Sequence, residues 1–237
     1  MTQYNYNKLF LPSQNFFNKF FLGSKIKFEK KLYNSIENIL KLQNPKKEFK
    51  LKLTKKHSVE EMASPPLSLN LYKFLCHFFK PKKILEIGTF IGISAMVFAK
   101  ASGKKSKVVT IEKFIEFYKI AKKNFILNKL DKNIHCIHGD AIDVLKKKKR
   151  EAYDLIFLDG DKGKYIDLFK IIEKKFIKKG SIVIIDNFFF HGDTLNKKCI
   201  TPKGVGVKRL QIYLKKSKKY FKTILPIYDG IALVQKI

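Results

Sequence analysis

The sequence has no tryptophan, only three cysteines, and 20 acidic residues against 50 lysines and arginines. It also lacks an apolar run of the roughly 18 residues that a membrane-spanning helix requires. The Phe-rich residues 1–22 are interrupted by Asn, Lys and Pro12 and have no small-residue cleavage site, so we do not expect a signal peptide. We therefore expect a cytoplasmic protein that does not associate with membranes.

The cysteines are odd in number and far apart, at Cys76, Cys136 and Cys199. They form no C-x-x-C pair, so neither a disulfide framework nor a zinc site is indicated. Apolar residues make up 45% of the 237 residues. That share is enough for the core of a folded domain, which excludes a globally disordered chain.

The shortage of acidic residues leaves a formal charge of +30, which has two explanations. A basic surface concentrates polyanions and contacts phosphates, which would suit an RNA partner. The other explanation is compositional drift towards lysine, because Arg150 and Arg209 are the only arginines in the sequence. Arginine is the better residue for two-pronged contacts with phosphates and bases. The sequence leaves both explanations open.

The chain divides into two parts. Residues 1–57 are lysine-rich and typical of helices, and we interpret them as a basic helical extension. Residues 58–237 have the pattern of one folded domain. Near its start, Ser64-Pro65-Pro66 predicts the beginning of a helix, with Ser64 as N-cap and proline tolerated in the first turn.

From residue 82 onward, short β-branched runs alternate with amphipathic segments that are typical of helices. This alternation predicts an α/β fold with a mostly parallel sheet covered by helices on both faces, and the last two runs predict a closing antiparallel pair. Ligands of such sheets bind at the carboxyl ends of the strands. The predicted strands are Ile84–Ile87, Val108–Ile111, Ile134–His138, Leu155–Leu158, Ser181–Ile185, Lys222–Leu225 and Ile231–Val234, and the predicted helices cover 92–101, 114–128, 141–149, 164–177 and 205–219.

Glycine-rich or polar segments follow the first three predicted strands. Gly88 and Gly92 have the spacing G-x-x-x-G; we expect Gly88 to permit a tight turn and Gly92 to let the backbone approach a ligand. Glu112 ends the second strand and can accept hydrogen bonds from ribose hydroxyls. Asp140-Ala141 follows the third strand, where an adenine edge can lie, and Ser94 begins a helix whose amides can hold a carboxylate. This ordered set predicts an adenosyl cofactor.

The next two predicted strands end in oxygen-bearing residues, Asp159 after one and Asp186-Asn187 after the other. Adjacent parallel strands would bring these side chains to one edge of the sheet. Two carboxylates and an amide carbonyl suit Mg²⁺, Mn²⁺ or Ca²⁺ and leave positions open for water and substrate. Lys162 follows Asp159 by three residues. It can take a substrate proton once a nearby cation or desolvation favours its neutral form.

Simpler interpretations exist for these residues. Asp159 and Asp161 can cap the helix that follows, and Asp186-Asn187 can form an ordinary turn. Lys162 is one lysine among many in this sequence, so its position can be accidental. His191, in the loop after Asn187, is expected to face solvent and not to act as a base.

The segment Leu85–Ala95, together with these acidic residues, resembles the cation-dependent O-methyltransferase family that includes catechol and caffeoyl-CoA O-methyltransferases. A bacterial branch of that family methylates hydroxyuridine in tRNA. The resemblance covers residues 58–237 and implies a Rossmann-like, class I S-adenosylmethionine-dependent methyltransferase domain with a seven-stranded sheet. Two departures affect the substrate side. Phe190 stands where the family often has Trp, and Arg209-Leu210-Gln211-Ile212 replaces Arg-x-Phe-Asn.

The resemblance also implies roles for individual residues. Met62 and Ser64 match a lid segment over the cofactor, and Glu86 has a structural role in the turn as its alternative. The residues implied at S-adenosylmethionine are Met62, Ser64, Glu86, Gly88, Ser94, Glu112, Asp140, Ala141 and Asp159; those implied at the metal, Mg²⁺ or else Mn²⁺ or Ca²⁺, are Asp159, Asp186 and Asn187; the implied catalytic base is Lys162.

The function predicted from these observations is metal-dependent transfer of a methyl group from S-adenosylmethionine to a hydroxyl that lies next to a second chelating oxygen. A catechol-like small molecule is one acceptor, and a 5-hydroxyuridine in tRNA is the alternative. A non-catalytic basic RNA-binding protein is a third hypothesis, against which the intact set of Asp159, Lys162 and Asp186-Asn187 argues. Lysines gathered around the mouth of the site would favour RNA, whereas an even spread would favour drift. We also expect a homodimer.

Overall fold

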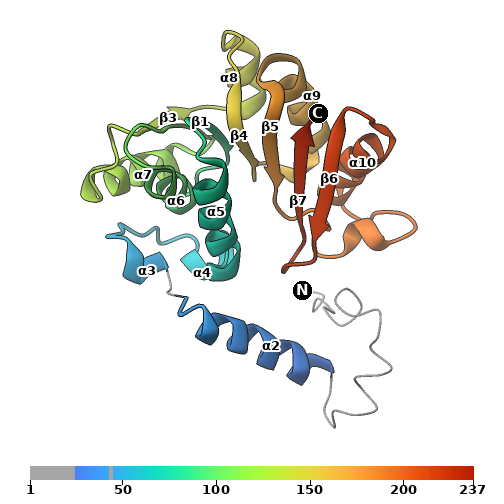
Figure 1. Cartoon of the computed structure of the whole chain (residues 1–237), viewed down its shortest axis with the longest axis horizontal. Helices are drawn as coiled ribbons and strands as arrows, with labels where there is room; N and C mark the ends of the chain where they lie inside the picture. Colours follow the sequence, from blue (N-terminus) through green and yellow to red (C-terminus); the bar gives the residue numbers. More distant parts are fainter. Residues whose placement is uncertain (1–24, 43–44) are drawn as a thin grey trace.

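A computed structural model describes residues 25–42 and 45–237 of the chain (Figure 1). The parts of the expected helical extension at residues 1–24 and 43–44 lie outside the described residues. Within the described part, helix α2 covers Lys25–Ile39, and two single turns follow, α3 at Pro45–Glu48 and α4 at Val59–Met62. No helix in residues 25–42 and 45–237 is long and apolar enough to cross a membrane.

A seven-stranded sheet in the order β3-β2-β1-β4-β5-β7-β6 forms the centre of the molecule. Strands β1 to β5 are parallel, and β7 runs antiparallel to both β5 and β6. This arrangement confirms the predicted fold class. The strands are β1 Lys83–Ile87, β2 Lys107–Glu112, β3 Ile134–His138, β4 Tyr153–Leu158, β5 Ile177–Ile185, β6 Tyr220–Leu225 and β7 Ile231–Lys236.

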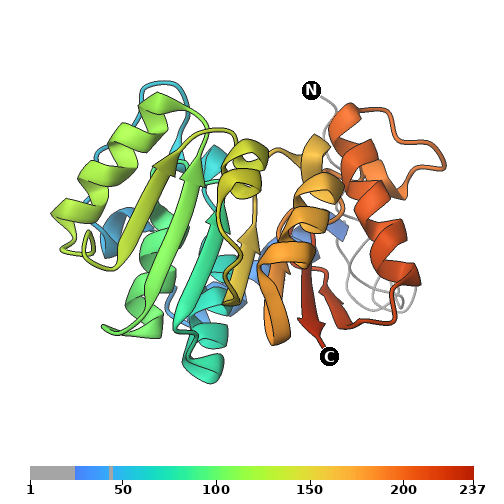
Figure 2. The ribbon, with the colours of Figure 1, turned by 90° about the horizontal axis from the view of Figure 1, so that it is seen from above.

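Helices cover both faces of the sheet (Figures 1 and 2). One face carries α5 Pro66–Phe79, α6 Ile93–Ser102 and α7 Ile115–Leu127, and the other carries α8 Ala141–Lys147, α9 Tyr165–Lys175 and α10 Pro202–Lys216. Because side chains alternate along a strand, Leu155 and Phe157 of β4 join the first core and Ile156 and Leu158 join the second. Strands buried on both faces explain why the sequence shows continuous apolar runs.

Several predicted boundaries differ from the structure by a few residues, and three of the differences have a clear physical reason. Ser64 does not cap α5: the N-cap is Pro65, which makes no side-chain cap, and the Ser64 hydroxyl points elsewhere. Helix α10 begins at Pro202, earlier than residue 205, because the Thr201 hydroxyl accepts a hydrogen bond from the Gly204 amide at 2.9 Å. Strand β5 begins at Ile177, earlier than Ser181, because it pairs with Tyr153 before a register shift.

Residues just before position 58 pack against the sheet domain. Phe49 is buried in the core beneath α5, α6 and α7. The backbone amides of Lys50 and Lys52 donate to the side chains of Asn128 and Asn124 on or beside α7, at 3.0 and 2.6 Å. This segment is therefore attached to the domain, and the predicted boundary at residue 57 stays a prediction.

Candidate active site

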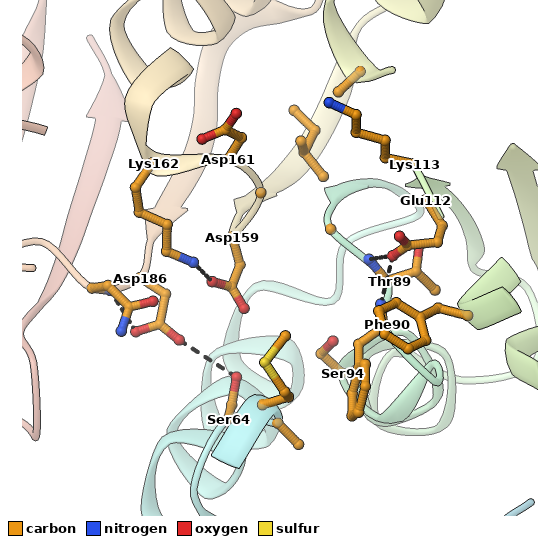
Figure 3. A pocket seen from close by; sticks show the side chains of 18 of the residues that line it. Ser64, Thr89, Phe90, Ser94, Glu112, Lys113, Asp159, Asp161, Lys162 and Asp186 are labelled. Atoms are coloured by element: carbon orange, nitrogen blue, oxygen red, sulfur yellow. Dashed lines mark hydrogen bonds and ion pairs between the residues drawn. The ribbon is translucent and has the colours of Figure 1, made fainter. Parts of the chain in front are cut away.

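A cavity of about 640 Å³ opens at the carboxyl edge of the sheet (Figure 3). It lies beside β1 and β4, between which the chain reverses its direction of travel across the sheet. The loops after β1 to β5 line it, and residues 60–65 and 228–229 complete the wall. The predicted cofactor and metal residues come together here, apart from Glu86.

The loop after β1, which is predicted to contact the cofactor, packs against the end of β4, where the predicted metal ligand Asp159 lies. Gly88 has φ +96°, and a Cβ there would lie 2.3 Å from the backbone oxygen of Asp159, so only glycine fits. Gly92 has φ +93°, but a Cβ on it would meet the ring of Phe125 at 2.3 Å. Gly92 does not line the cavity, and the expectation that it lets the backbone approach a ligand stays a prediction.

Glu112 holds the same loop in place (Figure 3). Its Oε2 accepts from the amides of Thr89 and Phe90 at 3.1 and 2.8 Å, and its Oε1 accepts from the amide of Phe114 at 2.8 Å. Burial raises the pKa of Glu112, and these backbone amides oppose the shift. The Glu112 carboxylate also lines the cavity, so a ligand bound there can reach it.

Glu86 is fully buried and does not line the cavity. Its side chain points into the core beneath α5 and α6, where the Thr110 hydroxyl hydrogen-bonds it and Thr110 in turn contacts Thr89. Burial raises the pKa of Glu86 to about 8, although the hydroxyls of Ser94 and Thr110 lower it. The structure thus places Glu86 as a buried acid that joins β1 to β2 beneath the glycine loop, and does not bring it to the lining of the cavity.

The remaining predicted cofactor residues do line the cavity: Met62, Ser64, Ser94, Asp140 and Ala141. Ser94 lies in the first turn of α6, and Met62, 45% exposed, lies at the rim. Asp140 caps α8 through the Ile142 amide and also accepts from Lys164 at 3.0 Å. Asp140 therefore already has partners that position it where β3 ends.

Two carboxylates face each other at the ends of β4 and β5. Lys162 donates to Asp159 Oδ1 at 2.6 Å, and Ser64 donates to Asp186 Oδ2 at 3.4 Å (Figure 3). Tyr72 donates to the same Oδ2 atom at 3.1 Å. Burial, followed by the charge of Asp159, raises the pKa of Asp186 to about 7, and Lys162 opposes the shift. Two acids packed together in a buried place favour a cationic partner.

The contacts of Asn187 and Asp161 bear on whether these polar residues form a metal site or only a turn and a helix cap. Asn187 follows Asp186 in the left-handed region at φ +50°, and its amide nitrogen donates to Asp229 at 3.2 Å. Asp161 caps the 3-10 turn η2, Lys162–Lys164, by accepting from the Gly163 amide. The helix-capping interpretation therefore holds for Asp161, whereas Asp159 faces Lys162 in the cavity.

Phe190, His191 and Tyr228 line the cavity beside the loop that follows β5. The His191 side chain is 69% exposed, in keeping with the expectation that it faces solvent. Gln211, in the segment that departs from the family pattern, donates to the carbonyl of Phe188 at 2.6 Å and to Thr194 at 3.0 Å. It thereby ties α10 to the loop that carries Phe190.

Sequence reasoning missed two residues that position Asp186 and Asn187. Tyr72 is a fully buried tyrosine in the apolar face of α5, and a hydroxyl that needs a partner in that face was the available signal. Asp229 precedes Gly230, and because Asp-Gly is a common turn sequence the pattern gives no sign of a further role. Among the described residues no three His, Cys, Asp or Glu side chains gather as a metal site, so any metal set here combines two carboxylates with the Asn187 amide.

The parallel sheet with its reversed strand order and its carboxyl-edge cavity defines a Rossmann-like methyltransferase fold. The chain belongs to the O-methyltransferase family, whose model matches residues 40–237. It is an S-adenosylmethionine-dependent O-methyltransferase of the caffeoyl-CoA and catechol type.

Named relatives agree with this assignment. Probable caffeoyl-CoA O-methyltransferase 1 of Dictyostelium discoideum is 30% identical over 173 residues, which cover 71% of this chain and 75% of the relative. The catechol O-methyltransferase of Niastella koreensis is 30% identical over 190 residues, covering 75% and 86%. The crystal structure of an O-methyltransferase from Bacillus cereus in complex with SAH has the same fold, with a TM-score of 0.69 at 22% identity over 94% of this chain and 97% of that one.

Proposed function

We propose that this protein is a divalent-metal-dependent O-methyltransferase whose acceptor is a small molecule with a hydroxyl next to a second oxygen. The observation that carries the proposal is the convergence of Asp159, Asp186 and Asn187 with Lys162 at one end of a cavity whose other end holds Glu112. A cofactor and an acceptor therefore fit side by side, with the reacting atoms between the two ends (Figure 3).

S-adenosylmethionine would lie along the loop after β1. The Glu112 carboxylate lines the cavity and suits one ribose hydroxyl, and Asp140 and Ala141 line the adenine end. The first turn of α6, with Ser94, would receive the carboxylate of the methionine part, because free amides at a helix N-terminus favour an anion. The methyl group then points towards the acidic pair.

The residues at the other end fit a hard divalent cation, Mg²⁺ first and otherwise Mn²⁺ or Ca²⁺. Asp159, Asp186 and Asn187 offer only oxygen ligands, and these come from the ends of neighbouring strands β4 and β5. When bound, such a cation holds two neighbouring substrate oxygens and makes the hydroxyl a better nucleophile. Tyr72 and Ser64 restrain Asp186, so this ligand is held in place before any substrate arrives.

Lys162 is proposed as the general base. Its Nζ lies 2.6 Å from Asp159 Oδ1 at the wall of the cavity, within reach of a hydroxyl bound between the acidic pair and the methyl group. In its neutral form it takes the hydroxyl proton on Nζ as the new O–CH₃ bond forms and the S–CH₃ bond breaks. Positioning the two reactants in line supplies much of the remaining rate.

The charge around the cavity supports a small acceptor over tRNA. The lining contains eight carboxylates, Glu60, Glu61, Glu112, Asp140, Asp159, Asp161, Asp186 and Asp229, against four lysines, Lys113, Lys162, Lys164 and Lys203. The whole chain has the reverse ratio, 20 acidic to 50 basic residues. A mouth built to receive an RNA backbone would gather lysines, so the tRNA hypothesis is the second candidate and the non-catalytic hypothesis the third. The homodimer and the cytoplasmic location stay predictions.

Methyl transfer from labelled S-adenosylmethionine tests both the metal and the acceptor. Activity on a catechol should vanish with excess chelator and return with added Mg²⁺ or Mn²⁺; full activity in chelator contradicts the metal. In parallel, nucleosides of unmodified tRNA incubated with the protein are analysed by mass spectrometry. Methylation of a hydroxyuridine without methylation of any catechol-like compound would replace the small-molecule acceptor with tRNA.

A further inference from the structure

Asp229 lies in the connection between β6 and β7, far along the chain from the acidic pair, yet it lines the same cavity. Its side chain is only 8% exposed. Oδ1 accepts from the backbone amide of His191 at 2.6 Å, and Oδ2 accepts from the side-chain nitrogen of Asn187 at 3.2 Å. One carboxylate thus holds two points near the start of the loop that follows β5.

The backbone beside Asp229 strengthens this attachment. The amide of Phe189 donates to the carbonyl of Asp229, and the amide of Phe188 donates to the carbonyl of Gly230, both at 2.9 Å. The loop needs such support because Asn187, Phe190 and His191 all have positive φ, at +50°, +42° and +51°. Non-glycine residues in that region persist only where surrounding contacts fix them.

We propose that Asp229 is a positioning residue that decides which branch of the Asn187 amide faces the metal. The two branches of an amide have nearly the same shape, but only the oxygen can bind a cation. A carboxylate accepts hydrogen bonds, so Asp229 takes the –NH₂ branch of Asn187 and leaves the oxygen branch for the cation. Partners that orient metal ligands in this way commonly change metal affinity about 10- to 100-fold when they are lost. The inference rests on the proposed metal site.

The test is a double-mutant cycle read by Mn²⁺ binding to the full chain in calorimetry, without substrate. Asp229→Asn should weaken Mn²⁺ binding about 10- to 100-fold, because an asparagine there can pair with Asn187 in either orientation. In the exchanged variant Asn187→Asp/Asp229→Asn, the new amide donates to the new carboxylate, whose other oxygen faces the cation. If the two single losses of Mn²⁺ affinity were independent, their fold-changes would multiply in the double variant. We expect the dissociation constant of the double variant to be at least about tenfold lower than that product.

Asp193→Asn is the matched control. Asp193 is as buried as Asp229, and it holds the loop before α10 by accepting from Ile200 and Thr201, but it does not line the cavity. Asp193→Asn should lower the melting temperature and leave Mn²⁺ affinity unchanged. Asp229→Asn should weaken Mn²⁺ binding at a temperature at which both variants are folded.

Three outcomes decide between the ideas. Wild-type affinity in Asp229→Asn overturns the positioning role. Additive effects in the cycle also overturn it, because Asp229 would then only hold the loop. A wild-type chain that binds no Mn²⁺, with or without S-adenosylmethionine, contradicts the proposed metal site itself.

Discussion

The two edges of the sheet carry opposite kinds of charge. At the carboxyl edge, acidic residues outnumber lysines in the cavity, and the charged groups there bond to particular partners, such as Lys162 with Asp159. The amino edge is the side where the helices lead back into β1 to β6, and the structure describes all of its segments. Nineteen exposed basic side chains lie there, against four carboxylates, Asp131, Glu151, Asp154 and Glu173. The basic residues are Lys80, Lys82, Lys83, Lys104, Lys105, Lys107, Lys129, Lys132, Lys146, Lys147, Lys149, Arg150, Lys174, Lys178, Lys179, Lys215, Lys216, Lys218 and Lys219.

The architecture explains part of this difference. Each helix between parallel strands runs from the carboxyl edge back to the amino edge, so its negative C-terminal end lies at the amino edge. Lysines occupy the last turns of α8, α9 and α10, and Lys175 donates to the carbonyls of Leu145 and Lys146 at the end of α8. The total charge of the chain therefore says little about its active site, because the two edges use charge differently.

The largest expected effect comes from the lysine at the carboxyl edge. Lys162→Arg keeps the positive charge next to Asp159 but supplies a group that does not lose its proton. Loss of a general base typically lowers kcat about 10²- to 10⁴-fold, so we expect at least about a hundredfold fall with S-adenosylmethionine affinity retained. Steady-state kinetics on the true acceptor measure it.

Lys147→Arg at the amino edge is the control for that substitution and should leave kcat unchanged. Retention of most activity by Lys162→Arg would reduce Lys162 to a partner of Asp159 and would remove the main functional contrast between the two edges.

Glu112→Ala should give the next largest effect. It removes the acceptor for a ribose hydroxyl and also the anchor of the Thr89 and Phe90 amides. The loss of a charge-assisted hydrogen bond costs about 1.5–3 kcal/mol, or roughly 10- to 150-fold in affinity. Calorimetry with S-adenosylmethionine measures it, with Glu151→Ala at the amino edge as the control. Unchanged affinity would place Glu112 outside the cofactor site.

The contributions of Glu86 and Glu151 to stability should change with pH in opposite directions. Burial raises the pKa of Glu86 in the folded state from 4.5 to about 8. Between these two pH values the folded state holds a proton that the unfolded state has lost. Stability therefore falls as the pH rises through this range. Hydrogen bonding to Lys83, against some burial, lowers the pKa of Glu151 to about 2, so Glu151 contributes stability that is lost as pH falls from 4.5 to 2.

Thermal unfolding of Glu86→Gln and Glu151→Gln at pH 5 and pH 8 separates the two cases. Glu86→Gln should gain melting temperature relative to the wild type, and more at pH 8 than at pH 5, at about 2–4 °C for each kcal/mol. Glu151→Gln should be slightly less stable than the wild type at both pH values, because exposed ion pairs contribute little. A Glu86→Gln variant that loses stability at pH 8 would show that the buried carboxyl is ionised.

The smallest effect is expected from neutralising part of the amino edge. Replacing Lys146, Lys147 and Lys149 by Gln at the end of α8 should cost a few tenths of a kcal/mol for each favourable helix-end contact, which is about the lower limit for such charges. Activity on a small acceptor should stay within about twofold of the wild type, since exposed charges more than about 10 Å apart are largely screened. Retention on a heparin column should decrease, because the surface loses positive charge. A large loss of activity on tRNA, with none on a catechol, would connect the amino edge to the reaction and break the separation of the two edges.

Most of the fold was predictable because it depends on periodicity. Apolar runs on strands buried from both sides stand out in the chain, and β3 has the predicted bounds. The ends were harder to place where a side chain decides them: Thr201 starts α10 early, and Ser64 bonds Asp186 instead of capping α5. Such choices depend on partners that are distant in sequence, and local propensity does not contain them.

The sequence by itself determined which residue types end the strands, and parallel topology then brings Glu112, Asp159 and Asp186 to one edge. The tertiary structure alone decided how each of them is used. It buries Glu86 away from the cavity, uses three backbone amides to hold Glu112, and draws Tyr72 and Asp229 from distant segments to orient Asp186 and Asn187. The physical reason is that pKa values and hydrogen-bond directions depend on burial and on neighbours in space, which a linear order of residues does not specify.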